Sequence, residues 1–163
     1  MNRKRLIVFL VLTALVTGFI FHNSLQNSQD SNEASDVIEE VVEPIIEAVV
    51  GKDVVDVNYV VRKGAHLTEF FALGVIVSFV ILELRKAGKY FFGYGLFYVL
   101  AVGVFDEYIQ SFSDRTSLVA DILIDFFGAA IGFAVIFIGA YLITARKIRK
   151  NRSQKGKDNG DKN

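Results

Sequence analysis

The sequence predicts an all-α fold, an integral membrane bundle of four transmembrane helices with an acidic amphipathic helical segment in the first outer loop. The chain has 163 residues, of which 52% are hydrophobic. These residues are concentrated in four long runs, and the charges are segregated between the runs. A membrane-spanning helix needs about 20 mainly apolar residues, and runs of this size meet that need. A soluble bundle would require polar stripes at every third or fourth residue, whereas residues 126–145 contain no charge.

The composition also excludes several classes of site. The chain has no cysteine, so it can form neither a disulfide framework nor a thiolate metal site. Its two histidines are too few for a multi-histidine centre, and the sequence therefore assigns no metal site. The high hydrophobic content argues against a disordered chain. No nucleic-acid partner is expected.

The sequence predicts four membrane spans within a single domain. They cover about residues 4–22, 64–82, 89–106 and 118–145, and with the outer insert 27–60 they form one membrane domain over residues 1–145. The first span follows Arg3-Lys4-Arg5, as the apolar part of a signal peptide would, but no small-x-small cleavage site follows it. We therefore expect an uncleaved anchor. Residues 146–163 are predicted to form a basic, disordered cytoplasmic tail.

The outer insert is strongly acidic. Residues 22–60 carry nine acidic residues against one lysine. Apolar pairs recur every four residues from Val37-Ile38 to Val49-Val50, which predicts an amphipathic helix over 36–50 that Pro44 bends or splits. We expect it to lie on the outer membrane surface or to cover the bundle. The alternative is a solvated lid without chemistry.

The distribution of basic residues predicts the orientation in the membrane. Lysine and arginine collect in cytoplasmic segments. They are found here at the N-terminus, in the short connection 83–89 and in the tail. Both termini are therefore expected in the cytoplasm, with residues 22–60 and 106–117 facing outward.

Polar residues recur at the outer end of every predicted span. An ionisable group in a membrane segment is a functional candidate by default. Arg62, His66 and Glu69 are spaced i, i+4, i+7 and should share one helix face. The candidate ligand-binding residues are Arg62, Lys63, His66, Glu69, Asp106, Glu107, Gln110, Arg115, Asp121 and Asp125.

The start of the fourth span combines charge with small residues. Asp121 and Asp125 are one helical turn apart, and Gly128 and Gly132 continue that face deeper into the membrane. Two glycines four residues apart allow a neighbouring helix to approach closely. The polar residues also have a structural interpretation, in which Asp121 or Asp125 pairs with an arginine, Arg62 or Arg115, and only fixes the register of the helices.

Three motifs resemble those of a known family. Residues 62–70, RKGAHLTEF, resemble the RK-x-AH-x-x-EF signature of VanZ-like proteins, the teicoplanin-resistance family. Residues 106–112 resemble its DE-x-x-Q-x-F element, and residues 121–128 its D-x-x-x-D-x-x-G element. Residues 21–26 are similar to a shorter Ser-x-Gln element after the first helix. The motifs occur in order over most of residues 6–140, and the acidic insert is not among them.

The resemblance implies a small multi-pass protein of the bacterial cell membrane, and it implies no particular reaction or cofactor. The family's namesake is associated with reduced susceptibility to a lipid-tailed glycopeptide antibiotic. This points to a cell-envelope protein whose outer-leaflet polar site binds a lipid headgroup, a cell-wall intermediate or such an antibiotic, with a contribution to antibiotic tolerance. Its partners would be a membrane lipid or a lipid-linked envelope precursor, and an oligomer is compatible with the sequence.

An enzyme is the alternative from another class. In that hypothesis the protein acts on a phosphate- or sugar-bearing lipid, and the candidate catalytic residues are His66, Glu69, Asp121 and Asp125. His66 would be the general acid or base and Glu69 its orienting carboxylate, while the aspartates would serve as a second base or as ligands of a hard divalent cation. The sequence leaves open whether any reaction is catalysed.

Overall fold

The computed structural model describes residues 2–25, 44, 57–84, 91–112 and 119–160. Its elements are four helices, α1 (Arg3–Ser24), α3 (Val57–Leu84), α4 (Phe91–Gln110) and α5 (Val119–Gly160). The predicted all-α class is therefore confirmed over the described residues. The predicted amphipathic helix at 36–50 lies outside them, apart from Pro44.

Each of the four helices is long and apolar enough to cross a membrane. The candidate spans are Arg3–Ser24, Val60–Leu84, Phe91–Gln110 and Val119–Arg152. Large apolar side chains on α1, α4 and α5 are exposed on the outside of the bundle, as expected for surfaces that contact lipid. The chain is a multi-pass membrane protein. Because α3 begins before Arg62 and α4 continues to Gln110, the motif at 62–70 lies within α3 and most of the motif at 106–112 lies within α4.

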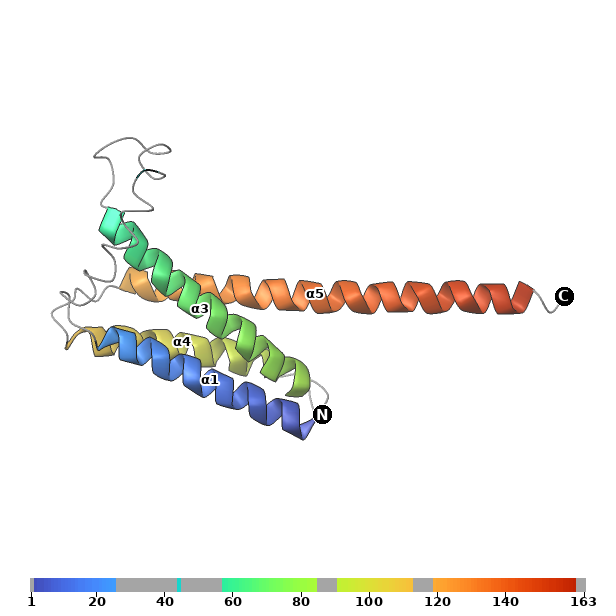
Figure 1. Ribbon diagram of the computed structural model, residues 1–163, viewed down its shortest axis with the longest axis horizontal. Coiled ribbons are helices and arrows are strands. Elements are labelled where there is room, and N and C mark those ends of the chain that lie inside the picture. The colour runs from blue at the N-terminus through green and yellow to red at the C-terminus, as the bar shows by residue number, and fades with distance from the viewer. Residues whose placement is uncertain (1, 26–43, 45–56, 85–90, 113–118, 161–163) are drawn as a thin grey trace.

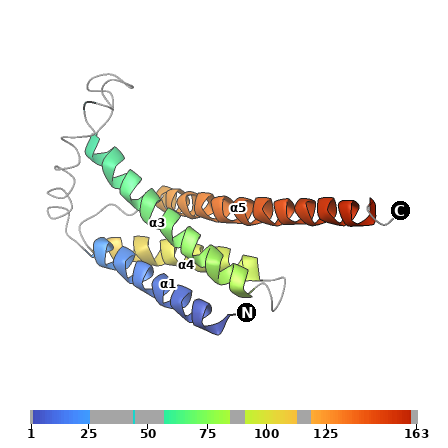
Figure 2. The same ribbon diagram turned by 45° about the vertical axis from the view of Figure 1, so that its right-hand side comes forward.

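Helix α3 is the central element of the bundle. It contacts α1, α4 and α5, and its most extensive interface is with α5. It runs diagonally between α5 on one side and the pair α1 and α4 on the other (Figures 1 and 2). The helices alternate in direction, so the ends of α1 and α4 meet the starts of α3 and α5 at one end of the bundle.

Glycines allow the close contact between α3 and α5. A Cβ atom placed on Gly128 would lie 2.5 Å from the carbonyl oxygen of Leu67, and one on Gly132 would lie 2.5 Å from that of Phe71. Gly74 of α3 is packed in the same way against the backbone of Ala129. These backbones can touch only because no side chain separates them. The predicted close approach at Gly128 and Gly132 is thereby confirmed, with α3 as the partner helix.

The remaining interfaces are held by aromatic and polar contacts. The rings of Phe9 and Phe79 stack with centroids 5.1 Å apart between α1 and α3. Phe92 of α4 packs edge-on against Phe133 of α5, with centroids 5.9 Å apart. Thr17 of α1 shares a hydrogen bond of 2.8 Å with the hydroxyl of Tyr98. Each contact links a different pair of helices.

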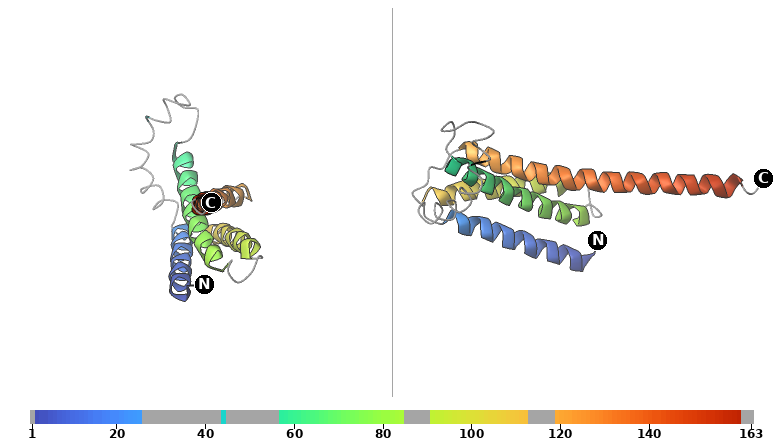
Figure 3. Two further views of the ribbon diagram at one scale, coloured as in Figure 1. Left: turned by 90° about the vertical axis from the view of Figure 1, so that its right-hand side faces the viewer. Right: turned by 45° about the horizontal axis from the view of Figure 1, so that its top comes forward.

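The basic tail was predicted to be disordered, but the structure shows helix through residue 160. Helix α5 continues to Gly160 and extends beyond the other helices as a single rod (Figures 1 and 3). Residues 140–155 contain neither glycine nor proline and are rich in arginine and lysine, which have high helix propensity. The helix therefore has no local signal to end where its apolar part does.

Candidate functional site

Polar side chains from three helices meet at one end of the bundle. Helix α3 contributes Lys63 and His66 from its first turns, α4 contributes Asp106 from its last turns, and α5 contributes Asp121 and Asp125 from its first turns. The predicted convergence of polar residues at one end is observed for these described residues.

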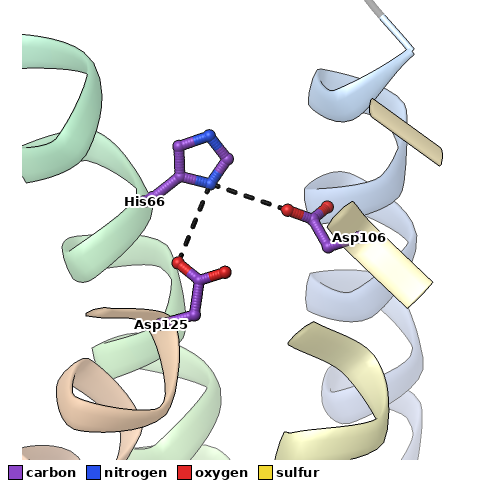
Figure 4. A group of neighbouring side chains, drawn as sticks. All are labelled: His66, Asp106 and Asp125. Atoms are coloured by element: carbon purple, nitrogen blue, oxygen red, sulfur yellow. Dashed lines mark ion pairs between the residues drawn. The ribbon is translucent and has the colours of Figure 1, made fainter. Parts of the chain in front are cut away.

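His66 faces two carboxylates in the centre of the cluster. Its Nδ1 atom lies 3.7 Å from Oδ2 of Asp106 and 4.0 Å from Oδ1 of Asp125 (Figure 4). One ligand atom from each of the three residues lies within 4.8 Å of the other two. Asp106 is 0% exposed and Asp125 is 1% exposed. The centre of the site is thus one imidazole between two deeply buried carboxyl groups.

Asp106 is oriented by two hydrogen bonds. The hydroxyl of Ser24, at the end of α1, donates to Oδ1 of Asp106. The side-chain amide of Gln110 donates to Oδ2 at 2.9 Å. Ser24 is fully buried, and its contact ties α1 to the cluster. Ser24 was not among the predicted site residues, although the Ser-x-Gln element at 21–26 was the signal that could have identified it.

Asp121 and Asp125 each have one oxygen atom that is incompletely satisfied. Oδ1 of Asp121 and Oδ2 of Asp125 are buried and accept no hydrogen bond from the part of the chain that the structure describes. Asp106, Glu107 and Asp121 all repel a charged Asp125, and Lys63 attracts it. Buried charge without compensation is costly, so these carboxyl groups must be neutralised, either by protonation or by a positive group nearby.

Lys63 forms an ion pair with Asp121. This pair joins the starts of α3 and α5. One hypothesis from the sequence was that Asp121 or Asp125 pairs with an arginine and only fixes the helix register. The observed partner of Asp121 is a lysine instead. Arg62 is partly exposed in the first turns of α3, and Arg115 lies outside the described residues.

Glu69 is held by α1. Its Oε1 atom accepts a hydrogen bond of 2.7 Å from the side-chain amide of Asn23. The sequence suggested Glu69 as the carboxylate that orients His66, whereas the two carboxylates measured beside His66 are Asp106 and Asp125. Glu107 and Gln110 are both buried in the last turns of α4.

A groove lies between α1 and α3. Its volume is about 710 Å³. Its walls are mainly apolar, and Glu69 and Thr68 are the polar residues among those that line it. The lining residues are Val16, Phe19, Val60, Val61, Gly64, Ala65, Thr68, Glu69 and Ala72. Glu69 therefore connects the groove with the polar end of the bundle.

This geometry defines a class of protein. Four helices are long and apolar enough to span a membrane, and they gather a histidine and several buried carboxylates at one end, so the chain is a multi-pass membrane protein with a polar cluster at one end of its helix bundle. A family model described as VanZ/LLP1 matches residues 9–142. The chain belongs to the VanZ/LLP1 family, as the motifs had indicated. No curated protein and no solved structure matches it.

Proposed function

We propose that the protein is a bacterial cell-membrane protein that binds the headgroup of an envelope lipid or lipid-linked cell-wall precursor at the outer leaflet. A lipid-tailed glycopeptide antibiotic has the same division into an apolar tail and a polar head, so binding it would contribute to antibiotic tolerance. The observation that supports the proposal is that Glu69 lines the apolar groove and accepts a hydrogen bond from Asn23, whose neighbour Ser24 donates to Asp106 of the polar cluster.

The groove suits an apolar tail. Small-molecule sites usually have volumes of about 300–1,000 Å³ with mostly apolar walls, and the 710 Å³ groove falls in this range. Gly64 and Ala65 keep the α3 wall low, and Val16 and Phe19 form the α1 wall. A chain lying there would place its polar end beside Glu69.

The polar cluster suits a headgroup that donates hydrogen bonds. It contains the carboxyl groups of Asp106, Asp121 and Asp125, together with the amine of Lys63 and the imidazole of His66. Carboxylates accept hydrogen bonds from hydroxyl and ammonium groups. Sugar or amine groups would therefore bind beside Glu69, which is partly exposed, and phosphate would lie near Arg62, whose planar guanidinium offers two donors to it.

One observation supports an enzyme as a second candidate. His66 lies between two buried carboxyl groups, an arrangement that can move a proton to or from a bound lipid. In this alternative the protein would convert a phosphate- or sugar-bearing lipid. Recovery of a chemically altered lipid after incubation would favour the enzyme, and recovery of the unchanged lipid would favour binding alone.

The groove can be tested by filling it. A side chain on Gly64 would meet nothing within 4 Å, so Gly64→Leu should fold normally and occupy the groove. We expect the lipid that co-purifies in mild detergent, quantified by mass spectrometry, to fall about tenfold or more, which corresponds to at least about 1.4 kcal/mol of lost affinity. Gly93→Leu, at the other end of the bundle and equally unobstructed, is the control. Equal lipid in both variants would contradict the proposal.

The proposed orientation places the polar site outside. This orientation is predicted because lysine and arginine are concentrated at the N-terminus, at 83–89 and in the tail, and such residues favour the cytoplasmic side. Single cysteines are introduced as Ser31→Cys, Ser113→Cys and Ser153→Cys, and intact cells are treated with an impermeant thiol reagent. We expect the first two variants to be labelled and the third to be protected. Labelling of Ser153→Cys with protection of the others would reverse the orientation.

A further inference from the structure

We propose that His66, Asp106 and Asp125 bind a divalent transition-metal ion. The donors are one imidazole nitrogen and two carboxylate oxygens, contributed by α3, α4 and α5. Imidazole suits zinc and carboxylate suits manganese, so a mixed set of this kind fits Zn²⁺ or Mn²⁺. Three protein ligands with a further open position are typical of a reactive zinc site. The inference stands apart from the headgroup proposal, because it concerns the metal alone.

An ion at this position would draw the three ligand atoms closer together. Ligand atoms about 2.0–2.2 Å from a tetrahedral zinc ion lie about 3.4 Å from one another. The Nδ1 atom of His66 lies 3.7 Å from Asp106 and 4.0 Å from Asp125. Both separations are too long for hydrogen bonds. To share a zinc ion they would shorten by about 0.3 and 0.6 Å, and the two carboxylate oxygens, which lie within 4.8 Å of each other, would also have to approach.

The burial and charge of the carboxylates point to a cation. Asp106 and Asp125 are almost completely inaccessible, and the negative charges of Asp106, Glu107 and Asp121 act on Asp125. Lys63 forms an ion pair with Asp121. A divalent ion between His66, Asp106 and Asp125 would offset the repulsion among these carboxylates.

Asp125 supplies an independent indication of a ligand. It is 1% exposed, and its Oδ2 atom accepts no hydrogen bond from the described residues. Its other oxygen faces His66 (Figure 4). A buried carboxylate usually has its oxygens satisfied, and coordination to a metal would satisfy this one.

Asp106 already has the supporting contacts of a metal ligand. Ligating side chains are commonly oriented by hydrogen bonds from a surrounding shell. Ser24 donates to Oδ1 and Gln110 donates to Oδ2 of Asp106. An oxygen with two lone pairs can accept from Gln110 and still coordinate an ion. The sequence excluded a multi-histidine centre and suggested the aspartates as possible cation ligands only in the enzyme hypothesis, whereas this cluster combines one histidine with Asp106 and Asp125.

Metal binding can be measured directly on the full-length protein. The wild-type protein in mild detergent is stripped with a chelator and titrated separately with Zn²⁺ and Mn²⁺, with bound metal determined by elemental analysis. We expect one ion of at least one of these metals per chain. Asp125→Asn and His66→Gln should each weaken binding about a hundredfold or more, and Ser24→Ala, which removes a supporting contact, about 10–100-fold.

Glu83→Gln removes a buried carboxylate at the opposite end of the bundle and should bind as wild type does. Elution volume and helical circular dichroism identify any variant that has unfolded. Wild-type protein that binds neither metal stoichiometrically overturns the proposal, as does wild-type affinity in both Asp125→Asn and His66→Gln. Because no lipid is added in the metal titration, its outcome does not decide whether the groove binds lipid, and the two proposals can fail separately.

Discussion

Gly132→Leu is expected to remove most of the protein from the membrane. A Cβ atom at this position would lie 2.5 Å from the carbonyl oxygen of Phe71 and 2.9 Å from the amide nitrogen of Val75, both backbone atoms of α3. Backbone atoms of a packed helix cannot move aside as a flexible side chain can, so α3 and α5 must separate. Overpacking of this kind costs about 1–3 kcal/mol or more, and it would also displace His66 from Asp125.

The measurement is membrane abundance by immunoblot, together with thermal unfolding in detergent. Gly139→Leu is a matched control, because Gly139 lies on the same helix and a side chain there would meet nothing within 4 Å. The control should accumulate and unfold like wild type. If Gly132→Leu matched Gly139→Leu in both measurements, the close contact between α3 and α5 would not be required for the fold.

The second large effect concerns the ion pair between Lys63 and Asp121. Asp121→Lys alone should deplete the protein, because it places two like charges where α3 and α5 meet. Removing one partner of a buried pair costs about 3–5 kcal/mol. The exchange Lys63→Asp with Asp121→Lys should restore abundance, because it re-forms the pair in reverse.

The same exchange separates a structural role from a binding role. If Lys63 also contacts a headgroup, the exchanged protein should accumulate normally but retain less co-purified lipid. The pairing control combines Asp121→Lys with Arg62→Asp and should not restore abundance, because neighbouring residues on a helix point in directions about 100° apart. Rescue by this control equal to that of the true exchange would contradict the assignment of Lys63 as the partner.

The sequence by itself determined the membrane class, the four helices and the end of the bundle at which polar residues gather. These features depend on local patterns. A run of apolar residues long enough to span a bilayer has no stable alternative to a helix there, because its backbone must satisfy its own hydrogen bonds. The spacing of Asp121, Asp125, Gly128 and Gly132 also placed all four on one helix face, and Gly128 and Gly132 were correctly identified as the point of close approach.

The partners within the site were decided only by the tertiary structure. His66, Asp106 and Asp125 come from three helices, and whether they meet depends on the rotation and depth of each helix in the bundle. The sequence placed His66 and Glu69 on one face of α3, but the packing of α1 gave Glu69 a partner in Asn23 and brought Ser24 to Asp106. Lysine, not arginine, met Asp121 for the same reason. Side-chain periodicity shows which face of a helix a residue occupies. The close packing of the α5 glycines against α3 determines which residues that face of α5 contacts.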